Sequence, residues 1–366
     1  MSSPRSFVIH SPSVCGSPDS PHGARSTCRA IAALLTTLTL VASTGCSSGL
    51  RVGSVDDTVG PVDPDRPLLV VLGTAQDAGS PQVNSPADHP ARQHPQLRRF
   101  ATSLGVIDPA TDGKWLFEAT PDFREQAWLL SQLAVDSRLT SDAASPANGT
   151  PDVTPDGIFL THAHIGHYTG LMFLGHESMG ARRVPVHAAP RMAEFLRTNG
   201  PWGQLVRYEN IDVQPLTVGG PIALTDTVSA TAFLVPHRQE YSEVVGFRID
   251  GPERSALFIP DIDSWDEWAE SGTDIVDLVQ TVDIAFLDAT FHDDNEIPGR
   301  DMSTFPHPRI VETMDRLDHL PAAVRDRVHF IHLNHTNPAQ WMGTPEREAI
   351  ERRGFNVAAR GYRFSL

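Results

Sequence analysis

Three closely spaced histidines, His162, His164 and His167, are the residues of this sequence best suited to chemistry. They directly follow the apolar run Ile158–Leu160, which we expect to be a strand, and they precede the helix-like run Tyr168–Leu174. Imidazoles at this spacing across a strand-to-helix turn can face one point, and a neutral imidazole nitrogen is the commonest metal ligand in proteins. The cluster therefore predicts a site for a divalent transition metal. Solvated histidines in a polar loop are the alternative.

The position of the cysteines restricts the other ligands of such a site. Cys15, Cys28 and Cys46 are the three cysteines of the chain, and none follows Cys46. A folded part that begins after Cys46 has neither a thiolate ligand nor a cysteine nucleophile, so its metal must be bound by histidine and carboxylate side chains.

Several apolar runs end in residues of those two types. The runs that we expect to be strands are Val184–His187, Ala232–Val235, Val244–Ile249, Ala256–Ile259, Ile284–Leu287 and His329–Leu333. His237, Asp261, Asp288 and His335 follow four of these runs directly. Functional side chains in α/β proteins gather at strand ends, where a rigid scaffold positions the loops. We therefore expect an α/β fold in which a sandwich of mixed sheets has helices outside.

The N-terminal segment is typical of an exported protein. Arg25 and Arg29 precede the apolar run Ala30–Ala42, which is too short to span a bilayer as a mature helix, and the small residues before Cys46 resemble a bacterial lipobox. We expect a lipoprotein-type signal peptide at 1–45, a lipidated Cys46 that begins a flexible tether at 46–66, and one domain at 67–366. An ordinary secretory signal cut nearby is the alternative. With either signal we expect an exported protein, at the cell membrane or in the periplasm; a buried helix is the remaining alternative.

Charge excludes some partners. The formal net charge is −16, so a polyanion is repelled, and no basic cluster indicates a nucleic-acid surface. We expect a small-molecule substrate, no nucleic acid, and contact with a membrane through the lipid anchor alone. The sequence does not indicate an oligomeric state.

The histidine segment resembles the His-x-His-x-Asp-His signature of the metallo-β-lactamase superfamily. Other segments resemble further motifs of that superfamily in the same order: Pro236-His237-Arg238, Phe258-Ile259-Pro260-Asp261, Phe286-Leu287-Asp288-Ala289-Thr290 and Ile331-His332-Leu333-Asn334-His335-Thr336-Asn337-Pro338. The segments Val71-Leu72-Gly73-Thr74, Gly79-Ser80-Pro81-Gln82 and Ala119-Thr120-Pro121-Asp122 are similar to the pyrroloquinoline quinone biosynthesis protein B branch. Five ordered motifs are more specific than one.

The resemblance implies the αββα sandwich of the metallo-β-lactamase fold, in which two mixed β-sheets are flanked by helices. It also implies the following metal ligands. One ion lies on His162, His164 and His237, and Asp261 bridges it to a second ion on His167 and His335. Members of the branch often have a cysteine-rich zinc segment after the first strand, but 84–96 here contains no cysteine, and only His89 and His94 could replace it.

Gly166 departs from the signature. In hydrolytic members of the superfamily this position is an aspartate that binds the second metal and helps to orient the attacking water. Glycine has no side chain for either role, so we expect a vacant coordination position, a weaker second ion and possible occupancy by one ion alone.

The resemblance suggests roles for two more residues and strand geometry excludes a third. Asp288 is expected to orient a ligand histidine by accepting its N–H, with a strand-end cap as an equal alternative. His307 aligns with a loop histidine that assists leaving groups, although an exposed loop residue is the more common case. His332 is not expected to be a ligand. It lies in the expected strand His329–Leu333, where successive side chains point to opposite faces, so its closeness to His335 in the sequence does not place it at the metal.

The function that we expect is metal-dependent hydrolysis of an ester, lactone, amide or phosphodiester by a metal-activated water. Zinc is the expected metal, as one or two ions, and iron or manganese also suits these donors. Two alternatives stay open: an oxidative or carrier role in pyrroloquinoline quinone biosynthesis, and a lipoprotein that binds a metal or a ligand without catalysis.

Overall fold

The computed structural model describes residues 63, 65–139 and 152–366. The expected signal peptide, the lipidation site Cys46 and nearly all of the tether lie outside these residues. Within the described ranges, no helix is both long enough and apolar enough to cross a membrane.

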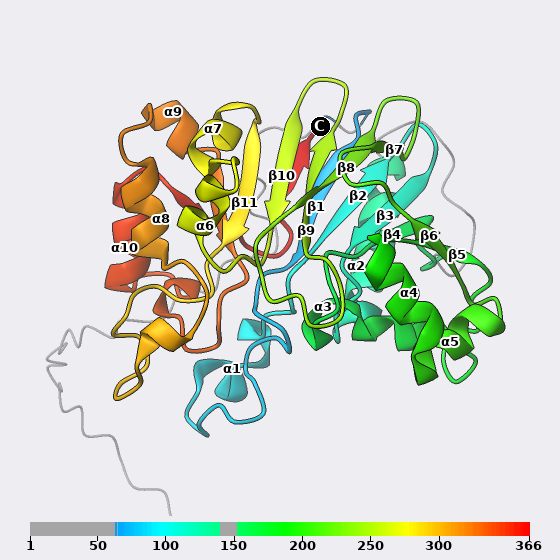
Figure 1. The fold of residues 1–366 in the computed structure, drawn as a ribbon, viewed down its shortest axis with the longest axis horizontal. Coiled ribbons are helices and arrows are strands. Elements are labelled where there is room, and N and C mark those ends of the chain that lie inside the picture. Colours follow the sequence, from blue (N-terminus) through cyan, green and yellow to red (C-terminus); the bar gives the residue numbers. More distant parts are fainter. Residues whose placement is uncertain (1–62, 64, 140–151) are drawn as a thin grey trace, which may run out of the picture. The chain divides into compact units, whose positions relative to one another are not determined.

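Two seven-stranded sheets form the centre of the described domain (Figure 1). The first sheet contains, in spatial order, β14 (Arg363–Ser365), β1 (Leu68–Gly73), β2 (Ser103–Asp108), β3 (Gly113–Phe117), β4 (Gly157–Phe159), β5 (Val184–Ala188) and β6 (Ile211–Pro215). The second contains β13 (Asn356–Val357), β12 (Val328–Ile331), β11 (Ile284–Asp288), β10 (Ser255–Ile259), β9 (Val245–Asp250), β8 (Ser229–Leu234) and β7 (Pro221–Ala223).

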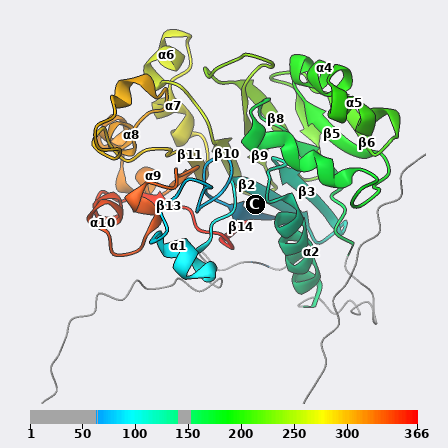
Figure 2. The same cartoon turned by 90° about the horizontal axis from the view of Figure 1, so that it is seen from below.

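Helices cover the outer face of each sheet (Figure 2). The α-helices are α1 (Pro90–Gln93), α2 (Phe123–Leu139), α3 (Ile165–Tyr168), α4 (Pro190–Thr198), α5 (Gly200–Arg207), α6 (Trp265–Glu270), α7 (Ile275–Gln280), α8 (Ile310–Leu317), α9 (Ala322–Arg325) and α10 (Pro345–Arg352). The 3₁₀ turns are η1 (Pro95–Leu97), η2 (Thr169–Leu174), η3 (Met302–Thr304) and η4 (Pro338–Gln340). Helices α2, α4 and α5 pack on the first sheet, whereas α6, α7, α8 and α10 pack on the second.

A third apolar core lies between the two sheets. Phe247 of β9 contacts Phe117 and Phe159 of the opposite sheet edge to face, with ring centroids 5.3 and 5.7 Å apart. Strands such as β1 and β10 are buried along their whole length because one face meets a helix layer and the other meets the second sheet. The expected sandwich with helices outside is therefore confirmed.

Strand directions bring the polar strand ends together. In the first sheet β3 pairs in parallel with β4, and β1 runs the same way because β2 pairs antiparallel with both β1 and β3. In the second sheet β10, β11 and β12 are parallel, and β8 shares their direction across β9. The residues that follow these strands therefore meet at one edge of each sheet. Backbone hydrogen bonds join the two edges, from Val245 N–H to Thr161 O (3.1 Å) and from Leu333 N–H to Thr74 O (2.9 Å).

Most expected elements are present within one or two residues of their predicted bounds. The seven apolar runs that we expect to be strands are β4, β5, β8, β9, β10, β11 and β12. The helix expected at 168–174 is instead split into the single turn α3 and the 3₁₀ turn η2. Strands β2, β3, β6 and β7 and the two C-terminal strands were not predicted.

Candidate metal centre

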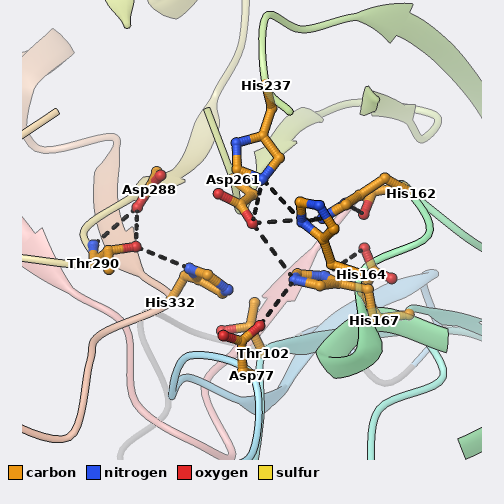
Figure 3. A network of polar contacts seen from close by, with 12 residues as sticks. Asp77, Thr102, His162, His164, His167, His237, Asp261, Asp288, Thr290 and His332 are labelled. Carbon is orange, nitrogen blue, oxygen red and sulfur yellow. Dashed lines mark hydrogen bonds and ion pairs between the residues drawn. The ribbon is translucent and has the colours of Figure 1, made fainter. Parts of the chain in front are cut away.

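The loops after β4, β8 and β10 bring three histidines and an aspartate together. His164 Nδ1 lies 2.9 Å from His162 Nε2 and 3.1 Å from His237 Nε2. Asp261 Oδ2 lies 3.2 Å from His237 Nε2 and 3.6 Å from His162 Nε2. Figure 3 shows the three rings directed at one point beside the Asp261 carboxylate. The structure therefore places these four predicted ligands in one cluster that is able to hold a divalent metal ion.

The opposite nitrogen of each ring has a partner outside the cluster. His237 Nδ1 lies 2.6 Å from Asp263 Oδ1, and His164 Nε2 lies 3.0 Å from Glu240 Oε2. These carboxylates can accept the ring N–H, so in the neutral ring the nitrogen that faces the cluster carries the lone pair. His162 Nδ1 is similarly 2.8 Å from Thr161 Oγ1. Lone pairs that face one another at such distances repel unless a cation lies between them, so this arrangement fits a metal.

The charges around the cluster also favour a cation. Burial lowers the pKa of His162 well below its usual value, so this ring is neutral. Burial acts the same way on His237, but the carboxylates of Asp261 and Asp263 outweigh it and raise the pKa of His237 to about 10. The pKa of Asp261 stays well below its usual value despite burial, because His237 and His307 stabilise its charged form. The negative field that draws a proton to His237 attracts a metal cation equally.

A second group of ligands lies on the other side of Asp261. His167 Nε2 is 3.6 Å from Asp261 Oδ2 and 3.7 Å from Asp77 Oδ1, and His332 completes a group of possible ligands with His167 and Asp77. His167 and His332 are both almost fully buried. Their Nε2 atoms and Asp261 Oδ1 are buried without any hydrogen-bond partner. Buried polar atoms seldom lack partners, so a second ion fits here as well.

His332 lies in this second group, contrary to the prediction that excluded it. Strand β12 ends at Ile331, and His332 has left-handed backbone with a φ of 67°, so the alternation of side chains along a strand does not apply to it. His332 Nδ1–H donates to Thr290 Oγ1 at 3.1 Å, and this hydroxyl donates to Asp288 Oδ1 at 2.7 Å. The ring is thereby oriented with Nε2 toward Asp261.

The prediction that His335 is a metal ligand is wrong, because this residue lies in a turn away from the cluster. Its Nδ1 is 2.9 Å from Ser85 Oγ, and its ring is tilted against His89 at 6.4 Å between centroids. Among the described residues, neither His335 nor His89 nor His94 belongs to a group that could hold a metal. His89 instead caps α1 by accepting from Ala91 N–H.

Glu118 follows β3 and is fully buried behind His167. Its Oε1 lies 3.5 Å from His167 Nδ1. Burial raises the pKa of Glu118, while His167 favours its charged form; burial lowers the pKa of His167, but Glu118 outweighs this and raises it. Glu118 is therefore placed to orient His167 as Asp263 orients His237, at a longer distance.

His307 is buried beside the cluster, and not in an exposed loop. Its Nδ1 lies 2.9 Å from Asp288 Oδ2 and 3.3 Å from Asp261 Oδ1. Burial lowers the pKa of His307, but Asp288 and Asp261 outweigh burial and raise it. Asp288 itself is completely buried and also accepts from Ile262 N–H and Thr290 N–H, so it is placed to orient His307; it also forms a further group of possible metal ligands with Asp261 and His332.

The space beside Gly166 is occupied, which contradicts the expectation of a vacant position. A Cβ atom on Gly166 would lie 2.4 Å from Asp77 Cα and 2.6 Å from Asp77 Oδ1. Asp77 lies in the loop that follows β1 and reaches the motif from a distant part of the sequence (Figure 3).

Comparison with known proteins identifies the family. The model of the beta-lactamase superfamily domain matches residues 114–333, which is more than half of the chain, so the protein belongs to that superfamily. It is 26% identical to coenzyme PQQ synthesis protein B of Xanthomonas campestris pv. campestris over 320 residues, which cover 81% of this chain and 99% of the relative. The same protein of Gluconobacter oxydans is 26% identical over 322 residues, covering 81% and 98%. The resemblance to this branch is thereby confirmed.

Solved structures share the fold. Zn²⁺-bound PqqB from Methylobacterium extorquens superimposes with a TM-score of 0.62 at 19% identity, covering 82% of this chain and all of that one. A diphosphatase of the PhnP family has a TM-score of 0.54 at 21% identity, covering 82% and 97%. At these identities the likeness extends to the architecture alone.

The residues that sequence reasoning missed have a common signal. Asp77, Glu118 and Asp263 were not singled out, yet each is an acidic residue a few positions after an apolar strand, as Asp261 and Asp288 are. The rule that functional side chains gather at strand ends would have selected them too.

Proposed function

We propose that this protein is a metal-dependent hydrolase of a small-molecule ester, lactone, amide or phosphodiester. The first ion is assigned to His162, His164 and His237, the second to His167 and His332, and Asp261 lies between them. When bound, zinc supplies a water of lowered pKa and a Lewis acid for a carbonyl or phosphoryl oxygen. Membership of the superfamily and the donor set support this proposal.

The observation that carries the proposal is the buried His307 beside Asp261. Its Nδ1–H donates to Asp288 Oδ2, so Nε2 is the atom left to protonate a leaving group. Asp288 and Asp261 outweigh burial and raise the pKa of this ring, which favours the charged form from which a general acid donates its proton. A protein that only carried a metal would have no use for an acid in this position.

Substituting His307 tests the proposal. We expect His307→Gln to lower kcat by about 10²–10⁴-fold for esters or phosphodiesters with alkyl leaving groups, because general acid catalysis contributes about that much. For p-nitrophenyl substrates the loss should be far smaller, since that leaving group departs without protonation. Steady-state rates on the paired substrates, with zinc content measured in parallel, provide the readout.

His292→Gln is the matched control, because His292 is another buried histidine in the same region that belongs to no metal group among the described residues. It should leave both substrate series unchanged. Equal losses on alkyl and p-nitrophenyl substrates in His307→Gln would contradict a general acid, and zinc-loaded protein without any turnover would contradict hydrolysis.

A second candidate, a role in the synthesis of coenzyme PQQ, is favoured by the similarity to coenzyme PQQ synthesis protein B over 81% of the chain. The donors also suit iron, and a redox role would then replace hydrolysis. Purified protein that retains iron, consumes oxygen and leaves the ester and phosphodiester panel untouched would favour this candidate over the first.

A further inference from the structure

We propose that Asp77 provides the second metal position with the carboxylate that the superfamily signature carries at the position of Gly166. This inference rests on the metal centre of the proposed function and deepens it. In this chain the carboxylate comes from the loop after β1 and not from the histidine motif. Asp77 thus takes the place of the aspartate that the signature has where this chain has Gly166.

Steric exclusion links the two positions. A Cβ atom on Gly166 would lie 2.4 Å from Asp77 Cα, a distance that real Cβ contacts essentially never show. The nearest atom belongs to the backbone, so a rotation of the Asp77 side chain would not relieve the clash. Gly166 has a negative φ and does not need to be glycine for its own conformation. It is required to be small because the Asp77 loop packs against it.

The position of the Asp77 carboxylate suits a ligand. Its Oδ1 is 3.7 Å from His167 Nε2, and an oxygen of Asp77 lies within 4.8 Å of a ring nitrogen of both His167 and His332. The Nε2 atoms of both histidines are buried and have no hydrogen-bond partner. The two unpartnered nitrogens thus lie close to a carboxylate whose side chain is itself 45% exposed.

The backbone holds the Asp77 loop against the segment that carries His332. Ala75 forms a β-bridge with Leu333, and Gln76 N–H donates to Leu333 O at 2.9 Å. Asp77 directly follows Gln76 and His332 directly precedes Leu333, and both have left-handed backbone, with φ values of 44° and 67°. Non-glycine residues rarely adopt this conformation, and where they do it often serves a functional site. Asp77 and His332 are therefore positioned as one unit.

Zinc titration of the full-length protein tests the assignment. Metal-free wild type, Asp77→Asn and Asp88→Asn are titrated calorimetrically with Zn²⁺ alone, and the bound metal is counted after dialysis. Asp77→Asn should weaken the second ion by at least ~10–100-fold, since loss of mere orienting groups costs that much, and should leave the first ion unchanged. Asp88→Asn removes the same charge from an exposed position in the following segment and should match wild type.

Gly166→Ala provides an independent test, because it adds a methyl group and no donor. Displacement of the Asp77 loop should weaken the second ion and lower the thermal melt, because backbone must shift, while the first ion stays close to wild type. A second ion bound by Asp77→Asn as tightly as by wild type would overturn the assignment and leave the hydrolase proposal intact. Wild type that binds one ion alone would also overturn it, whereas wild type that binds no zinc would overturn both proposals.

Discussion

The two halves of the metal centre are built in different ways. The first position takes His162 and His164 from one motif and His237 from the end of β8, and the outward nitrogen of each ring has a close polar partner. The second position takes His167 from the motif but collects His332 and Asp77 from two loops that are far apart in the sequence. Both positions therefore draw ligands from the two sheets, but the first takes two of its rings from one short motif, whereas the second takes each of its ligands from a different loop or turn.

This difference suggests that the two positions differ in strength. At the first position three ring nitrogens and Asp261 face one another, and Asp263 is held 2.6 Å from His237. At the second position the orienting contact between Glu118 and His167 is longer, at 3.5 Å, and Asp77 is half-exposed. We expect the first ion to bind more tightly and the second to be lost first on dialysis against a chelator.

The largest expected effect is the loss of a ligand from the first position. His164→Ala should weaken the first zinc ion by at least ~100-fold, more than the ~10–100-fold cost of losing an orienting partner. Competition with a chromophoric chelator measures this affinity. The exposed His176→Ala is the control and should bind zinc as wild type does. Equal zinc affinity in His164→Ala and wild type would remove the basis for the first position.

The next effect distinguishes two histidines that lie three positions apart. His332→Ala should lose the second ion and retain the first, because its Nε2 is buried and unpartnered beside Asp261. His335→Ala should retain both ions, since its ring is hydrogen-bonded to Ser85 and belongs to no group of possible metal ligands among the described residues. Zinc content after dialysis measures both. Loss of the second ion from His335→Ala alone would restore the original prediction and overturn the placement seen here.

The same pair shows how far the sequence could predict this protein. The layered fold and the first metal position can be predicted from short sequence patterns. These are apolar runs that form strands, and a histidine motif at the end of one of them. The sequence could not show that His332 and not His335 is the ligand. That distinction depends on β12 ending at Ile331 and on the left-handed backbone of His332, which no sequence pattern predicts. The sequence also could not predict the contact between Asp77 and Gly166. This contact forms in the folded protein, where a β-bridge holds the loop after β1 against the loop after β12.

The smallest expected effect compares the two orienting carboxylates. Asp263→Asn should weaken the first ion by about 10-fold, at the lower end of the cost of losing a partner of a ligand histidine. Glu118→Gln should weaken the second ion by less, because its contact with His167 is longer and the group is buried with its oxygens otherwise unpartnered. An amide keeps the shape of each side chain, so a thermal melt close to that of wild type separates orientation from folding. Parallel zinc titrations of the two variants measure the ratio of the effects. If Glu118→Gln costs more than Asp263→Asn, then the second position is the more strictly oriented of the two, and the order of metal strength inferred from their geometry is reversed.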